Sequence, residues 1–160
     1  MIVVSNTTPI LSLFKIERLG LLESLFGHVT IPMAVYNEIA VLGKGKDGHD
    51  LLDAAPYIHV KEIQNTMAAR LLQSQLDYGE AETIVLAVEL AADIIVLDEK
   101  KARKITQANS QRVIGTIGIL RLALSKGLIS DMKAHLDALI ASGIWIDKKL
   151  YQTVLQSVNE

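Results

Sequence analysis

The segment GEAETIVLAVELAADIIVLDE, residues 79–99, decides the fold of this chain. Its first part, Glu80 to Ala92, is almost uniformly apolar and predicts a central, buried helix. Ile94–Leu97 follows as the clearest strand of the sequence, and Asp98 ends it. A buried helix that leads into a buried strand is typical of a parallel sheet covered by helices.

The same alternation of strands and helices extends toward both ends of the chain. Further strands are predicted at Met1–Val4, Val29–Ile31, Ile58–Val60 and Val113–Ile114. Helices are predicted at Ile10–Leu22 with a break near Gly20, Ala34–Ile39, Asp50–Ala55, Ala68–Gln75, Lys100–Ala108, Thr116–Ser125, Asp131–Ala141 after a cap at Ser130, and from a cap at Asp147 onward. Ser5–Pro9 is interpreted as a turn and Gly43–Gly48 as a flexible loop. Residues 1–160 are therefore expected to form one α/β domain with right-handed crossovers.

Composition narrows the class of protein. The 160 residues are 50% hydrophobic with a net charge of −2, which argues against disorder and against a basic surface over the whole molecule. The absence of cysteine excludes disulfides, zinc–thiolate sites and thiol catalysis. The uncharged start, Met1–Phe14, does not resemble a signal peptide, and no stretch has the length of a membrane span. A cytoplasmic protein without a membrane partner is expected.

Acidic and amide side chains follow the predicted strands. Ligands of parallel sheets bind beyond the carboxyl ends of the strands. The residues near those ends are Asn6, Glu38, Glu80, Glu82, Asp98 and Glu99. Clustered carboxylates without cysteine or a suitable histidine pair favour a hard cation such as Mg²⁺ or Mn²⁺. Such an ion removes their mutual repulsion and activates water.

Each acid also has a simpler interpretation. Glu80 and Glu82 can satisfy the unpaired amides of a helix start, and both interpretations stay open for them. Taken singly, Asp98 is better explained as the cap of the following helix, and Glu38 as a solvated helix residue. Only convergence of these side chains in the fold favours a metal site.

Five segments, read together, resemble a known family. They are VVSNTTPI at residues 3–10, IPMAVYNEI at 31–39, GEAETI at 79–84, VLDE at 96–99 and GTIG at 115–118. In combination they resemble PIN-domain proteins, most closely the DUF3368 subgroup, whose relatives include VapC toxins. The resemblance implies a three-layer α/β/α fold with a five-stranded parallel sheet in the order 3-2-1-4-5 and C-terminal helices. It also implies a ribonuclease that uses Mg²⁺ or Mn²⁺.

The resemblance carries roles onto individual residues. It implies Glu38, Glu82 and Asp98 as catalytic acids that bind the metal together with Asn6, and Glu80 and Glu99 as further candidate ligands. Its strand order brings Asn6 and Asp98 close together. Asn6 stands where most PIN nucleases have Asp, and an amide oxygen carries no charge, so weaker metal binding is expected.

Substrate contacts are expected beside the acids. Lys101 and Arg103 belong to a basic run after Asp98, and we expect them to hold RNA phosphates. A solvated helix face explains the same run equally well. Thr7 is expected to offer its hydroxyl to the substrate or to the water shell of the metal, and a local turn is the alternative.

Three functions compete at this point. The first is a metal-dependent endoribonuclease that hydrolyses RNA phosphodiester bonds, as the toxin of a toxin–antitoxin pair, with RNA, an antitoxin protein and a second copy in a homodimer as partners. The second is a PIN-like module that binds RNA or protein and cleaves weakly. The third, a doubly wound domain that uses Asp98 for phosphotransfer, would need a Lys or Ser/Thr constellation that the sequence does not supply.

Overall fold

A five-stranded parallel sheet forms the centre of the molecule. The computed structural model describes residues 1–42 and 51–160. The strands are β1 (Val3–Ser5), β2 (Val29–Pro32), β3 (Ile58–Lys61), β4 (Ile94–Val96) and β5 (Val113–Ile114), in the order β3-β2-β1-β4-β5. Every pair is parallel. The expected fold class and strand order are confirmed.

Alternate residues of the strands enter two separate apolar clusters. Val3 and Ile94 belong to one cluster, whereas their neighbours Val4 and Ile95 belong to the other. Side chains of successive strand residues point to opposite faces, so both faces of the sheet are buried. Register follows this pattern, since Val3 pairs with Ile94 and Val4 with Ile95.

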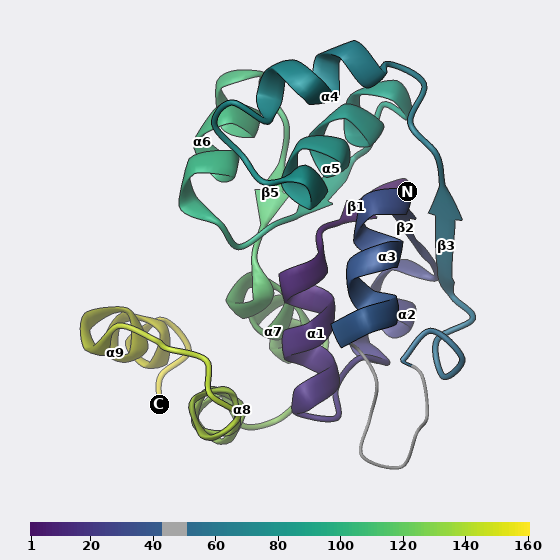
Figure 1. Cartoon of the computed structure of the whole chain (residues 1–160). Coiled ribbons are helices and arrows are strands. Elements are labelled where there is room, and N and C mark those ends of the chain that lie inside the picture. Colours follow the sequence, from purple (N-terminus) through teal and green to yellow (C-terminus); the bar gives the residue numbers. More distant parts are fainter. Residues whose placement is uncertain (43–50) are drawn as a thin grey trace.

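Helices cover both faces, as Figure 1 shows. On one side lie α4 (Thr66–Leu72), α5 (Tyr78–Glu89) and α6 (Lys100–Ala108). On the other lie α1 (Thr7–Lys15), α2 (Leu21–Phe26), α3 (Met33–Leu42) and α7 (Thr116–Ser125), from which α8 (Met132–Ala141) and α9 (Lys148–Ser157) extend to one side. No helix within the described ranges is long and apolar enough to cross a membrane.

The first helix begins earlier than the sequence analysis predicts. Thr7 starts α1 and Pro9 lies in its first turn, so interpreting Ser5–Pro9 as a turn was wrong. Asn6 is extended, with φ −81° and ψ 174°, and precedes the helix as its N-cap residue. Proline is tolerated there because the first amides of a helix have no intrahelical partner. Asn6 therefore lies where a strand ends and a helix begins.

The central helix begins at Tyr78 rather than at Glu80. Asp77 accepts a hydrogen bond from the Glu80 amide, and the Glu80 carboxylate accepts one from the Asp77 amide. This reciprocal pair is a capping box, which fixes the helix start. The helix ends at Glu89 rather than at Ala92, and Val88 is 61% exposed, so the predicted end and the predicted burial of the last turn were wrong.

Two smaller predictions differ from the structure. Leu51–Ala55 forms successive turns instead of a helix, since the amides of Ala54 and Ala55 reach back only three residues. Pro56 disfavours the helical conformation at the residue before it. Asp131, not Ser130, caps α8, with its carboxylate accepting from Ala134. Asp50 and the predicted loop Gly43–Gly48 lie outside the described residues.

Candidate active site

The N-termini of several helices gather at the C-terminal ends of the parallel strands, a region called here the carboxyl edge of the sheet. The helices α1, α3, α6 and α7 each follow a strand, β1, β2, β4 and β5 respectively. Because the strands are parallel, these helices begin at the same edge. A helix start carries partial positive charge and unpaired amides, so this edge stabilises carboxylates without a cation.

Asn6 lies at the centre of this edge. Its amide donates to the Val96 carbonyl at 2.9 Å, which continues the β1–β4 ladder. The side chain is 5% exposed, and its Oδ1 accepts from the Thr83 hydroxyl of α5 at 3.4 Å. The predicted adjacency of β1 and β4 is confirmed, so Asn6 and Asp98 follow neighbouring strands, and the expected closeness of their side chains stays a prediction.

Glu38 reaches this edge from the second turn of α3. The hydroxyl of Thr7 donates to Glu38 Oε2 at 2.7 Å. On its other side Glu38 abuts Gly79, where a Cβ atom would collide with Oε1. Interpreting Glu38 as a solvated residue was wrong, because it is half-buried and joins α1, α3 and the start of α5. Thr7, predicted to contact substrate, orients this carboxylate.

Glu82 connects the central helix to the start of α3. The side chain is 6% exposed, and its Oε1 accepts from the Ala34 amide at 3.1 Å. Glu82 thus pairs with an otherwise unpaired amide at the start of α3, and not with one at the start of its own helix, α5. The Tyr78 hydroxyl also bonds to Glu82, which, together with the negative charge of Glu82, raises the pKa of Tyr78.

Glu80 and Glu99 have local roles. Glu80 completes the capping box of α5, and burial raises its pKa, with the charges of Asp77 and Glu99 adding to that rise. Glu99 caps α6 by accepting from the Ala102 amide at 2.7 Å. The helix-start interpretation therefore holds for Glu80. It fails for Asp98, because Glu99 occupies the position of the cap.

Asp98 meets a helix that begins eighteen residues later. Its Oδ1 accepts from the Thr116 amide at 2.7 Å and its Oδ2 from the Thr116 hydroxyl at 2.6 Å. These bonds bring the carboxylate to the start of α7, beyond β5. A Cβ at Gly115 would lie 2.5 Å from Asp98 Oδ1 and 2.9 Å from an Arg103 guanidinium nitrogen. Glycine at this position leaves room for both groups.

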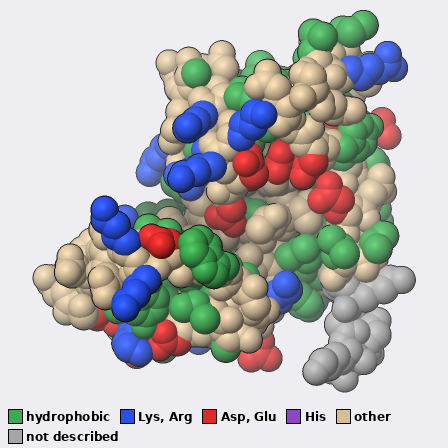
Figure 2. Space-filling model, turned by 60° about the vertical axis from the view of Figure 1, so that its left-hand side comes forward, with side chains coloured by type: hydrophobic (Ala, Val, Ile, Leu, Met, Phe, Trp, Pro, Cys, Tyr) green, Lys and Arg blue, Asp and Glu red, His purple; other side chains and the backbone are tan. Residues whose placement is uncertain are grey.

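Among the residues that the structure describes, the acids of the edge have no cationic side chain within 4.0 Å of their carboxylate oxygens. The ion pair that meets this distance, Lys133–Asp137, lies elsewhere, on α8. Arg103 is half-buried next to Asp98, whereas Lys101 is exposed on the same helix. Figure 2 shows acidic side chains in a band across one face, with Lys and Arg side chains gathered beside it. Negative charge next to positive charge suits a phosphate backbone held against a metal ion.

The candidate metal ligands are of a chemical type that suits a hard divalent ion. They are carboxylate and amide oxygens, which Mg²⁺ and Mn²⁺ prefer. Gly79 and Gly115 leave space beside Glu38 and Asp98 that a Cβ would fill. As the side chains stand, no three Asp, Glu or His residues within residues 1–42 and 51–160 converge closely enough to hold an ion. Binding therefore requires the carboxylates to turn toward one another.

Sequence reasoning assigned no role to several residues that shape the edge. Thr116, Gly115 and Gly79 lie within segments that carry the family resemblance, and their contacts explain why those residue types are needed. Thr83 and Tyr78 were missed as well. The roles of Thr83 and Tyr78 depend on how α5 packs against neighbouring elements, and residue spacing along the chain does not reveal this packing.

This combination of parallel sheet, strand order and acidic edge defines a nuclease-like α/β domain. Residues 2–160 match the model of the DUF3368 family, described as a PIN domain. The chain belongs to this PIN-domain family, and a nuclease-type function follows as the coarse assignment. Neither the curated proteins nor the solved structures contain a significant match.

Proposed function

We propose that the protein is a metal-dependent ribonuclease that hydrolyses RNA phosphodiester bonds at the carboxyl edge of the sheet. The single observation that carries the proposal is the gathering of four oxygen-bearing side chains at this edge. Asn6 and Asp98 directly follow β1 and β4, while Glu38 reaches the edge from α3 and Glu82 from α5. These residues would bind Mg²⁺ or Mn²⁺. Such an ion supplies an activated water and stabilises the charge that develops on the phosphate.

The residues of the chain itself have positioning roles in this proposal. Thr7 orients Glu38, the Ala34 amide orients Glu82, and Thr116 orients Asp98. These hydrogen bonds keep the three carboxylates at the carboxyl edge of the sheet, and the carboxylates turn from these positions toward an arriving ion. Arg103 would hold a phosphate next to Asp98, and Lys101 would approach the RNA from the exposed face of α6.

The proposal is tested with Asp98→Asn. The Asn side chain still offers an oxygen to the Thr116 amide, so the fold is expected to persist, while one negative ligand is lost. We expect wild type to cleave a structured RNA in Mn²⁺ and the variant to be slower by on the order of 100-fold. The matched control is Asp53→Asn, which removes an exposed carboxyl elsewhere. Equal cleavage by wild type and Asp98→Asn would sink the proposed role of Asp98.

A metal titration tests the site independently of cleavage. Glu82→Gln keeps an oxygen for the Ala34 amide and removes one charge. We expect Mn²⁺ affinity to fall by on the order of tenfold, because affinity for hard cations follows the number of charged ligands. Unchanged Mn²⁺ affinity would remove Glu82 from the metal site.

A second candidate function is favoured by Asn6. An uncharged ligand at the centre of the edge suits a PIN-like module that binds RNA or a protein and cleaves weakly. In the cleavage assay this function predicts RNA binding without Mn²⁺-dependent products from wild type. The toxin role, an antitoxin partner and a homodimer stay predictions.

A further inference from the structure

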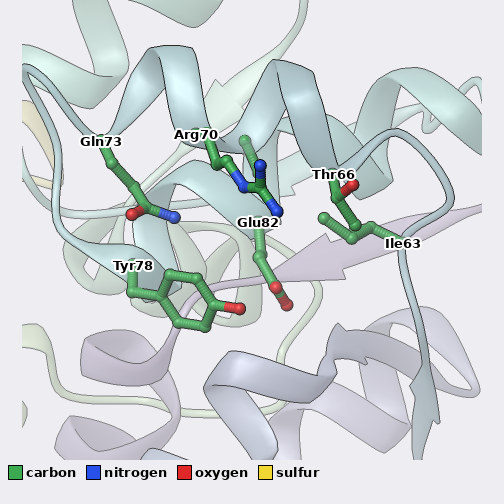
Figure 3. A pocket seen from close by; sticks show the side chains of 7 residues that line it. Ile63, Thr66, Arg70, Gln73, Tyr78 and Glu82 are labelled. Carbon is green, nitrogen blue, oxygen red and sulfur yellow. The ribbon is translucent and has the colours of Figure 1, made fainter.

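A cavity opens beside the acidic edge, between α4 and α5. Its volume is about 210 Å³, and seven side chains line it: Ile63, Thr66, Ala69, Arg70, Gln73, Tyr78 and Glu82. Figure 3 shows Arg70 of α4 and Gln73, the residue just after α4, above Tyr78 and Glu82 of α5. Pockets for drug-sized ligands begin at about 300 Å³, so this cavity suits one ring system rather than a larger molecule.

The lining is suited to a flat, polar-edged ring. Tyr78 is 56% exposed and offers an aromatic face, and Arg70 offers a planar guanidinium. Gln73 adds an amide that both donates and accepts. Unpaired bases of RNA are recognised by stacking on aromatic and guanidinium planes and by hydrogen bonds to their edges.

Arg70 is available to a ligand. Its side chain makes no ion pair with a carboxylate among the residues that the structure describes, and it is exposed. A guanidinium usually pairs with a carboxylate or stacks on a ring when one lies near. In Figure 3 its side chain extends from α4 toward Glu82.

Glu82 joins the cavity to the acidic edge. Its carboxylate accepts from the start of α3 on one side and lines the cavity on the other. The Tyr78 hydroxyl points toward that carboxylate. A ring in the cavity would therefore lie directly next to a phosphodiester bond placed at the edge.

We propose that this cavity is a base-binding subsite that holds one unpaired RNA nucleobase next to the scissile phosphate. Tyr78 and Arg70 stack on the base, and Gln73 contacts its hydrogen-bonding edge. The subsite gives the enzyme a preference for the base at that position. This inference rests on the proposed function, because it places the RNA at the edge that contains Glu82.

The experiment measures binding separately from cleavage. Four RNA hexamers, one for each base, are titrated in EDTA, which prevents metal-dependent cleavage, with wild type, Tyr78→Ala, Tyr78→Phe and Gln73→Ala, and fluorescence anisotropy is the readout. Arg121→Ala is the control for an alanine substitution outside the cavity, since Arg121 is exposed on α7 and does not line the cavity. Thermal melting verifies that each variant is folded.

We expect Tyr78→Ala to bind the preferred hexamer about tenfold more weakly, because stacking of one base contributes that much. Tyr78→Phe keeps the ring and is expected to bind within about twofold of wild type. Gln73→Ala is expected to reduce the difference among the four hexamers. Arg121→Ala should change neither affinity nor preference.

Two outcomes would overturn the subsite. One is Tyr78→Ala binding all four hexamers as tightly as wild type, and the other is a wild type that binds none of them. Cleavage of structured RNA in Mn²⁺ by the same preparations separates this failure from that of the proposed function. Cleavage with unaltered base preference in Tyr78→Ala would leave the ribonuclease standing without the subsite. Binding that depends on Tyr78, without cleavage, would leave the subsite standing without the ribonuclease.

Discussion

Acidic side chains at the sheet edge and on the C-terminal helices are stabilised in different ways. On α8 and α9, Asp137 accepts from Lys133 at 2.7 Å and from the Tyr151 hydroxyl at 2.6 Å. At the sheet edge, Glu82 and Asp98 accept from backbone amides of helices that begin far away in sequence. The negative charge of Asp137 is therefore paired with a cation, whereas the charges of Glu82 and Asp98 are stabilised by hydrogen bonds from backbone amides and a hydroxyl.

The difference shows where charge is left for a ligand. A carboxylate paired with lysine has little attraction left for a metal ion, because its charge is already balanced. A carboxylate held by amides keeps its full charge and a set direction. The sheet edge therefore combines negative charge with orientation, and the C-terminal helices do not. Three substitutions test this contrast, from the largest expected effect to the smallest.

The largest effect is expected from Gly115→Ala. The new Cβ would lie 2.5 Å from Asp98 Oδ1 and would displace this carboxylate from Thr116. We expect a loss of stability of about 1–3 kcal/mol from overpacking. Under the proposed function, displacement of Asp98 also predicts a fall in cleavage on the order of 100-fold. Urea unfolding and the Mn²⁺ cleavage assay measure the two effects.

Gly20→Ala is the matched control for this glycine substitution. A Cβ at Gly20 would meet no atom within 4 Å, and its φ of −58° suits alanine. Its stability and cleavage are expected to equal those of wild type. If Gly115→Ala behaves like Gly20→Ala, the close approach of Asp98 to Gly115 has no consequence for the site.

An intermediate effect is expected from Asn6→Asp. The change adds a charge at a position that is 5% exposed and whose side-chain oxygen accepts from the uncharged Thr83 hydroxyl. Without metal, repulsion and burial should lower stability by about 1 kcal/mol. With Mn²⁺, the extra charge should raise metal affinity on the order of tenfold. Calorimetric titration of Mn²⁺ and thermal melting with and without the ion provide the readouts.

Asn159→Asp is the control for added charge, because it places the same group at an exposed position. It should leave Mn²⁺ affinity unaltered. An Asn6→Asp variant that binds Mn²⁺ no better than wild type would show that residue 6 does not face the ion.

The smallest effect is expected from Asp137→Asn on α8. Hydrogen bonds from Lys133 and Tyr151 lower the pKa of Asp137 below its ordinary value of 3.8. A lowered carboxyl pKa stabilises the fold above the unfolded value, and this contribution is lost as the pH falls through the folded value. Asp137→Asn should therefore be slightly less stable than wild type at about pH 7, and the difference should vanish well below pH 3.8.

Urea midpoints at both pH values measure this difference, and added salt should shrink it because the pair is exposed. Asp53→Asn, which removes an exposed carboxyl that has no ion pair within the described residues, is the control. A difference that persists unchanged in acid would mean that the Lys133–Asp137 pair does not contribute through its charge.

Elements with strong local signals were predictable from the sequence. The bounds of α6 and α7 are as predicted, because a strand end precedes each helix and its length is set by local residues. The start of α1 was missed although its signal was present. Asparagine is a preferred N-cap and proline is compatible with the first turn, so Asn6 and Pro9 indicate a helix as well as a turn.

The contacts of the acids were not predictable from spacing. Glu82 meets Ala34 across 48 residues, and Asp98 meets Thr116 across 18. Both contacts exist only after the strands pair in the order β3-β2-β1-β4-β5, which brings distant helix starts to one edge. Local rules favoured Asp98 as the cap of the next helix, and neighbouring Glu99 takes that position. The sequence therefore indicated which acidic residues matter, but their hydrogen-bond partners could be identified only once the strand order was known.

The hydrogen bonds of Glu82 and Asp98 have a consequence for how relatives of this chain are judged. Each carboxylate links two helix starts or strand ends, so replacing it with a side chain that has no oxygen acceptor loosens the fold whether or not the protein cuts RNA. A lineage that abandoned catalysis would still be under pressure to retain an oxygen acceptor at both positions, which the acids satisfy. Their presence in a related sequence is therefore poor evidence of enzymatic competence, and direct assays must decide.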